Sequence, residues 1–90
     1  MDIQSMIESA GSIIIFTGEG EEGTWEKYTG KRTVRAIKAR LTRERCGGDR
    51  WVSVWLLQGN DDDDTVYDCL DLDTGGIVDT RNIDPDDIED

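Results

Sequence analysis

The sequence predicts one small α+β domain: a mostly antiparallel sheet of three or four strands, one main helix packed on a face, and a short N-terminal helix. Ninety residues correspond to a single domain, residues 1–90. Apolar and β-branched segments at residues 13–16, 51–58 and 77–83 are typical of strands. A segment rich in alanine and arginine, residues 33–46, is typical of a helix.

Both predicted helices have recognisable ends in the sequence. Residues 2–10 place apolar side chains at helical spacing after Asp2, which can cap the N-terminus, and before Gly11, which can end the helix. Residues 33–46 begin at Thr33, a second capping residue, and are followed by two glycines. Basic residues occupy much of this second helix, so only a narrow apolar stripe is left to pack on the sheet.

The strands differ in how apolar they are. Residues 13–16 are apolar throughout, which indicates a buried strand, and residues 51–58 are apolar on both faces, which predicts a central position. Residues 24–28 are ambiguous, although a short strand presenting Trp25 fits them. The remaining predicted segments are an acidic loop at residues 18–23, a turn at 59–64, a strand at 65–72, a tight turn at 73–76, a strand at 77–83 and a frayed acidic tail at 84–90.

Charge is sorted along the chain, whose formal net charge is −11. Residues 1–30 hold six acidic residues and one basic residue, residues 31–50 hold eight basic and two acidic, and residues 51–90 hold thirteen acidic and one basic. The three segments therefore carry −5, +6 and −12. Two strong fields of opposite sign on one small body steer charged partners, which favours a binding protein over an enzyme.

The residue types of common catalytic and metal sites are missing. The chain has no histidine, which removes the commonest general base and the commonest zinc ligand. Cys46 and Cys69 have no companions for a structural zinc site, and we expect two reduced thiols. Residues 73–75 match the Asp-Thr-Gly triplet of aspartic proteases, but too few residues follow for that fold, so a hairpin turn is expected. The acidic run at residues 61–64 lacks the alternating spacing of a calcium loop. We predict no enzyme activity, no cofactor and no metal site.

Nothing in the first ten residues resembles a secretory signal, because they contain no basic residue and no long apolar run. The longest apolar run, residues 13–16, is far too short to span a bilayer. An acidic protein is also repelled by anionic lipids. We therefore expect a cytoplasmic protein with no membrane partner.

The acidic surface is the predicted binding surface. Alternate side chains of a strand point the same way and lie about 6.5–7 Å apart, close to the distance between successive phosphates of a nucleic-acid strand. Asp71 and Asp73 fit that spacing, and a row of such carboxylates can compete for lysine and arginine side chains that bind nucleic acid. A surface that only keeps the protein soluble is the alternative. The predicted partner-binding residues are Asp61, Asp62, Asp63, Asp64, Asp68, Asp71 and Asp73, a second patch of Glu19, Glu21 and Glu22, and the aromatic anchors Trp25 and Tyr28.

In its size, its acidic hairpins and its lack of a signal sequence, the chain is similar to small acidic proteins encoded by phages and mobile elements, such as anti-CRISPR inhibitors and other DNA mimics. The resemblance implies an inhibitor that occupies the nucleic-acid-binding surface of a basic host defence protein or complex, in the cytoplasm of the host cell.

Self-association is the alternative function. The basic helix of one chain would dock on the acidic sheet of another and form a homodimer or a longer oligomer. Direct nucleic-acid binding by residues 31–50 is disfavoured, because the rest of the chain carries −17 and repels phosphate over a Debye length of about 8–10 Å. The choice depends on whether the helix and the acidic residues lie on the same side of the domain.

Overall fold

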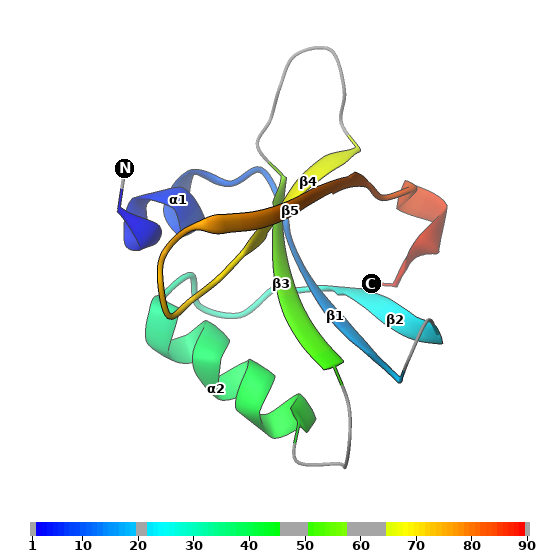
Figure 1. Ribbon diagram of the computed structural model, residues 1–90, viewed down its shortest axis with the longest axis horizontal. Helices are drawn as coiled ribbons and strands as arrows, with labels where there is room; N and C mark the ends of the chain where they lie inside the picture. Colours follow the sequence, from blue (N-terminus) through cyan, green and yellow to red (C-terminus); the bar gives the residue numbers. More distant parts are fainter. Residues whose placement is uncertain (1, 20–21, 46–50, 58–64, 90) are drawn as a thin grey trace.

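The computed structural model contains a six-stranded sheet and two α-helices, which confirms the α+β class and adds strands to the three or four expected (Figure 1). It describes residues 2–19, 22–45, 51–57 and 65–89, and for Glu19, Glu22 and Arg45 it describes the backbone. In chain order the elements are α1 (Ile3–Ser9), β1 (Ile13–Glu19), β2 (Glu22–Lys27), α2 (Val34–Arg45), β3 (Trp51–Leu57), β4 (Val66–Leu70), β5 (Ile77–Asn82), the 3-10 helix η1 (Pro85–Asp87) and β6 (Ile88–Glu89).

The strands lie in the order β5-β4-β3-β1-β2-β6. Every neighbouring pair is antiparallel except β2 with β6, which is parallel. The apolar strands β1 and β3 occupy the centre, because side chains on both of their faces need to be covered. The central position predicted for the strand that begins at Trp51 is therefore confirmed.

Both helices begin at the predicted capping residues. The Asp2 carboxylate accepts a hydrogen bond of 2.8 Å from the backbone N–H of Ser5, and this bond lowers the pKa of Asp2. The Thr33 hydroxyl accepts one of 3.1 Å from the N–H of Ala36. α1 ends one residue earlier than expected, because Ala10, rather than Gly11, takes an extended conformation after it.

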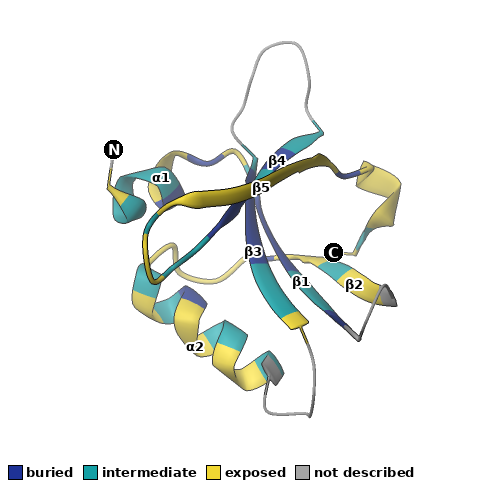
Figure 2. Cartoon of the chain, viewed as in Figure 1, coloured by how far each residue is buried: buried dark blue, intermediate teal, exposed yellow. Residues whose placement is uncertain are grey.

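Each face of the sheet carries its own apolar core. Figure 2 shows buried stretches in the central strands β1, β3 and β4. On the first face, the stripe of α2 that contains Ile37 packs with α1 against alternate residues of β1 and β3, such as Ile15 and Leu56. On the second face, Ile14 and Trp55 pack with Tyr67, Cys69 and Ile83. The alternation of side chains along a strand divides the apolar residues between these two cores.

The C-terminal segment differs from the frayed acidic tail that the sequence predicts. Ile83 is buried, and its N–H donates to the carbonyl of Thr65 over 2.8 Å. Asp84 caps η1, and Ile88 packs on the second core while β6 pairs with Trp25 and Glu26 of β2. Two apolar side chains, five positions apart, therefore hold an otherwise acidic segment on the sheet.

Two strand boundaries also differ from the prediction. The expected acidic loop at residues 18–23 is shorter, because β1 continues to Glu19 and β2 begins at Glu22. β4 ends at Leu70 rather than at residue 72, because Asp71 starts the turn that leads to β5. Gly75 closes this turn with φ +77°, a conformation that other residues rarely adopt.

Candidate partner-binding surface

Asp71 and Asp73 do not form the predicted row of carboxylates on a strand. The Asp71 carboxylate accepts a hydrogen bond of 2.9 Å from the N–H of Asp73, and its carbonyl accepts one of 2.8 Å from Gly75. Asp73 is exposed and lies 3.7 Å from the ammonium group of Lys38 on α2. The prediction is wrong for this pair, because Asp71 shapes the β4–β5 turn and Asp73 faces the basic helix.

Asp68 is only partly exposed and has a partner within the sheet. It lies opposite Thr80 of β5, whose hydroxyl donates to its carboxylate over 2.8 Å. This cross-strand bond ties the Asp68 carboxylate to β5, and the partner-binding role of Asp68 stays a prediction.

The other predicted acidic residues are described only in part. Asp61, Asp62, Asp63, Asp64 and Glu21 lie outside the described residues, so their role stays a prediction. The backbones of Glu19 and Glu22 pair with each other at the end of the β1–β2 hairpin.

The two predicted aromatic anchors lie in different surroundings. Tyr28 is buried in the first core, and its hydroxyl donates to the carbonyl of Lys31. It is therefore part of the fold and is not exposed to a partner. Trp25 is half-buried on the second face, beside Phe16 and Trp55.

The largest group of exposed acidic residues with a described position was missed as a site by the sequence reasoning. It lies in the C-terminal segment, on the face of the sheet opposite α2 (Figure 1). Within the described chain, none of its members forms an ion pair with a basic side chain. We call it the C-terminal acidic group: Asp84, Asp86, Asp87 and Glu89. The sequence does contain a pattern that could have predicted an ordered segment here. Two isoleucines, Ile83 and Ile88, flank a capping aspartate and a proline.

The positive charge of the basic helix α2 is neutralised in part by nearby carboxylates. Arg40 donates to Glu26 of β2 over 2.8 Å and to Glu44 over 2.9 Å, and its side chain is 17% exposed. Burial lowers the pKa of Arg40, but the two carboxylates outweigh that effect and raise it. Arg35 and Arg43 are exposed and form no ion pair within the described residues. Acidic residues therefore lie on both sides of the sheet, and only some of them neutralise α2.

An aromatic recess was also missed, although the sequence shows its three tryptophans. The ring centroids of Phe16 and Trp25 lie 4.5 Å apart, and those of Trp25 and Trp55 lie 5.5 Å apart. The guanidinium of Arg81 lies over both indoles, 6.0 Å from Trp25 and 5.3 Å from Trp55. Trp51, which is 71% exposed, completes a hollow of about 530 Å³ that we call the aromatic recess.

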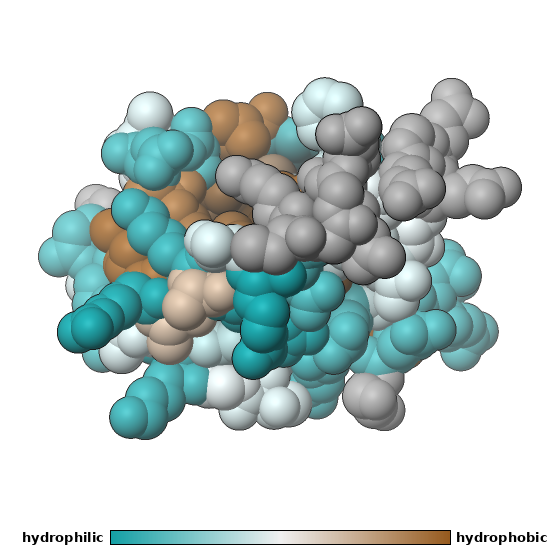
Figure 3. Space-filling view, turned by 90° about the horizontal axis from the view of Figure 1, so that it is seen from below, coloured by the Kyte–Doolittle hydropathy of each residue, from teal (hydrophilic) through white to brown (hydrophobic). Residues whose placement is uncertain are grey.

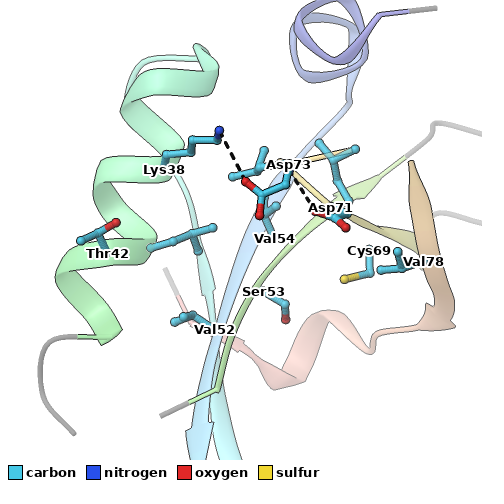
Figure 4. Close-up of a pocket in the computed structure, with 12 residues that line it drawn as sticks. Lys38, Thr42, Val52, Ser53, Val54, Cys69, Asp71, Asp73 and Val78 are labelled. Carbon is cyan, nitrogen blue, oxygen red and sulfur yellow. Dashed lines mark hydrogen bonds and ion pairs between the residues drawn. The ribbon is translucent and has the colours of Figure 1, made fainter. Parts of the chain in front are cut away.

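A second hollow, of about 400 Å³, lies between α2, β3 and the β4–β5 hairpin (Figure 4). We call it the groove. Lys38 reaches across it from α2 towards Asp73, while Val52 and Val54 line it from β3. Cys69 also lines the groove, but burial and then the charge of Asp79 raise the pKa of this thiol. It is therefore a poor nucleophile at neutral pH.

Within the described residues, neither a metal site nor a membrane-spanning helix adds to this description, and no similar known protein does. Among the described residues, no three histidine, cysteine or carboxylate side chains are grouped so that they could hold a metal ion. In the described chain, no helix is long and apolar enough to cross a membrane. No protein-family model, no curated protein and no solved structure matches the chain.

Proposed function

We propose that the chain is an acidic protein-binding inhibitor, which occupies the basic nucleic-acid-binding surface of another protein. The observation that supports this proposal is the C-terminal acidic group, which is exposed and held on the sheet by Ile83 and Ile88. It carries four of the negative charges of a chain whose net charge is −11. A fixed cluster of carboxylates that form no ion pair within the described residues can replace phosphates in a basic groove at little cost in ordering.

The position of this group differs from the one predicted from the sequence. Asp71 and Asp73 belong to a turn that faces α2, whereas the C-terminal acidic group lies on the other side of the sheet. The positive charges of α2 therefore weaken the negative electrostatic field of the C-terminal acidic group less than that of Asp73. The host defence protein implied by the resemblance to anti-CRISPR inhibitors and other DNA mimics is one such partner.

The test is affinity capture from the host cell with two variants of equal net charge. In the first, Asp86→Asn, Asp87→Asn and Glu89→Gln neutralise the acidic group and keep Asp84, which caps η1. In the control, on the side of the helices, Asp2→Asn and Glu8→Lys change the net charge by the same three units at exposed residues, and asparagine at residue 2 can still cap α1.

We expect the unchanged chain and the control to retain a nucleic-acid-binding protein that duplex DNA displaces. The first variant is expected to lose it. Equal retention by both variants, or retention that duplex DNA does not affect, would contradict the proposed role of this group.

Self-association is the second candidate, and the exposed side chains of Arg35 and Arg43 favour it. Their charges are not neutralised within the described residues, so α2 could dock on the C-terminal acidic group of another copy. Sedimentation should then show a dimer at low salt that dissociates at high salt, and that Arg35→Glu with Arg43→Glu abolishes. A monomer at every salt concentration would exclude this docking.

A further inference from the structure

Part of β3 has a free edge in the middle of the sheet. Pairing between β3 and β4 begins at Val54, which lies opposite Leu70, because the chain turns away at Asp71. Among the described residues, Trp51, Val52 and Ser53 therefore pair with β1 alone. An unpaired strand edge can accept another strand.

Among the described residues, the backbone groups that lack a partner along this edge are those of Val52. The N–H of Leu57 donates to the carbonyl of Ser12, on the side of β1. Backbone groups alternate in direction along an antiparallel strand, so those of Ser53 also face β1. The N–H and carbonyl of Val52 point the other way, towards the side where β4 is missing.

The two hollows meet at this edge, because both are lined by Val52 and Ser53. The groove lies mainly on the first face, with Leu41 and Leu70, and reaches Cys69 at the edge, whereas the aromatic recess lies on the second face. Figure 3, which views the molecule from below, shows apolar surface gathered in one part of that view, with hydrophilic side chains beside it. A strand added beside Val52 would send alternate side chains into the two hollows.

The aromatic recess suits a guanidinium group. Arg81 already lies over two of its indoles, and a cation within about 6 Å of a ring centroid is attracted by the ring. Among the described residues, each basic side chain that lines a hollow is close to an acidic one, Arg81 at 3.5 Å from Asp79 and Lys38 at 3.7 Å from Asp73. Asp71, a further acidic residue, lines the groove. These five residues around the two hollows carry a net charge of −1, which favours a basic segment over an acidic one.

We propose that the free edge of β3 binds an extended, basic segment of the partner by strand addition. One partner residue pairs with Val52 and places an apolar side chain in the groove, and a neighbouring arginine enters the aromatic recess beside Trp51. This proposal rests on the proposed function, since it assigns the binding mode of the same basic partner.

The probe for this site is a blocked heptapeptide in which valine and arginine alternate, and tryptophan fluorescence reports its binding. We expect saturable binding that shifts the amide resonances of residues 51–53. A peptide with glutamate in place of arginine should not bind. A peptide with N-methylvaline at its centre should bind at least about tenfold more weakly, because it lacks one backbone donor, a loss of about 1.4 kcal/mol. Equal binding of the N-methylated peptide would overturn strand addition.

Two proline variants locate the site. Val52→Pro removes the outward N–H of the free edge, and Asn82→Pro does the same at β5. Asn82 also points its N–H outward, because Ile83 pairs inward with Thr65 and the direction alternates. We expect only Val52→Pro to abolish binding. The reverse result would place the peptide on β5 and overturn the proposal, and the N-methylated peptide tests strand addition even if Val52→Pro does not fold.

Side-chain variants test the recess. Trp51→Ala should weaken binding about fivefold, through the loss of one cation–π contact of roughly 1 kcal/mol. Arg81→Gln should leave binding unchanged or tighten it, because a competing cation is removed. Weaker binding by Arg81→Gln, together with binding of the glutamate peptide, would show that the recess takes an anion instead.

The same titration separates this proposal from the proposed function. Neutralising Asp86, Asp87 and Glu89 should change the affinity for the heptapeptide by less than about twofold, since none of them lines either hollow. Peptide binding without capture of a nucleic-acid-binding protein would contradict the proposed function and leave the edge site standing. Failure of the heptapeptide to bind would overturn the edge site alone.

Discussion

The guanidinium of Arg32 joins α1 to the chain just before α2. It donates to the carbonyl of Ala10 over 2.6 Å, and to those of Ile7 and Glu8 over 3.4 Å. These are carbonyls at the C-terminal end of α1, which have no partners within the helix and attract a positive charge. The side chain of Gln4 in α1 also donates a hydrogen bond of 2.9 Å to the carbonyl of Arg32.

We predict that Arg32→Ala lowers the free energy of unfolding by about 1 kcal/mol, as expected for one good hydrogen bond to a charged donor at an exposed site. Arg35→Ala is the matched control, because Arg35 is exposed and has no described polar contact; its effect should stay within about 0.5 kcal/mol. Urea unfolding of both variants measures the difference. Equal stability of the two would show that the Arg32 contacts contribute nothing.

Cys69 gives a residue-scale test of burial. Its pKa is raised by desolvation and then by Asp79, so the folded state holds the proton more tightly than the unfolded state, whose thiol titrates near about 8.5. Stability from this group is therefore complete below about pH 8.5 and is lost as the pH rises towards the higher pKa of the folded state. In a Cys46→Ser background, alkylation by iodoacetamide at pH 8 should be slow until urea unfolds the chain. Rapid alkylation of the folded protein would contradict this burial.

At the scale of elements, the C-terminal segment is the clearest test of the fold. Ile83 is 3% exposed and shares the second core with Ile14, Trp55 and Tyr67. We predict that Ile83→Ala costs roughly 2–4 kcal/mol, through lost burial and a cavity. Val78→Ala, at a position that is 63% exposed, should cost less than about 1 kcal/mol.

Thermal unfolding measures both variants, and hydrogen exchange tests the same segment without a mutation. The N–H of Ile83, which bonds to Thr65, should exchange slowly. A frayed tail would instead give rapid exchange and a small effect of Ile83→Ala.

Much of the fold could be predicted from local chemistry. The capping residues Asp2 and Thr33, the apolar stripe of α2 and the apolar strand at residues 13–16 carry their signals in adjacent positions. β6 carries no such signal, because two residues pair with β2 only after Ile83 and Ile88 are anchored. Its existence depends on contacts between distant parts of the chain.

The candidate site was harder to predict for the same reason. The spacing of Asp71 and Asp73 is correct for a strand, but the turn begins one residue after β4 ends, and that boundary depends on the glycines that follow. Trp51 is a large aromatic residue of the kind that is usually buried. It is exposed because β4 no longer pairs with β3 beyond Val54. No local pattern shows where one strand stops covering another.

At the scale of the whole molecule, we expect repulsion between the many acidic residues to outweigh attraction within the few described ion pairs. The described ion pairs lie mainly around α2, and the two with the least exposed basic side chain join Arg40 to Glu26 and to Glu44. The extents are 38 × 28 × 22 Å, while the Debye length is about 30 Å at 0.01 M salt and about 8 Å at 0.15 M. At low salt, every charge therefore acts on most of the others, and the net charge of −11 disfavours the folded state.

We predict that the midpoint of thermal unfolding rises between 0.01 and 0.15 M sodium chloride, because salt screens this repulsion more than it weakens the few close ion pairs. Neutralising Asp86, Asp87 and Glu89 changes the net charge from −11 to −8 and should reduce the rise. Scanning calorimetry at several salt concentrations measures both proteins. If the midpoint fell with salt instead, the ion pairs of Arg40 would outweigh the repulsion, and the sorted charge would stabilise the fold rather than oppose it.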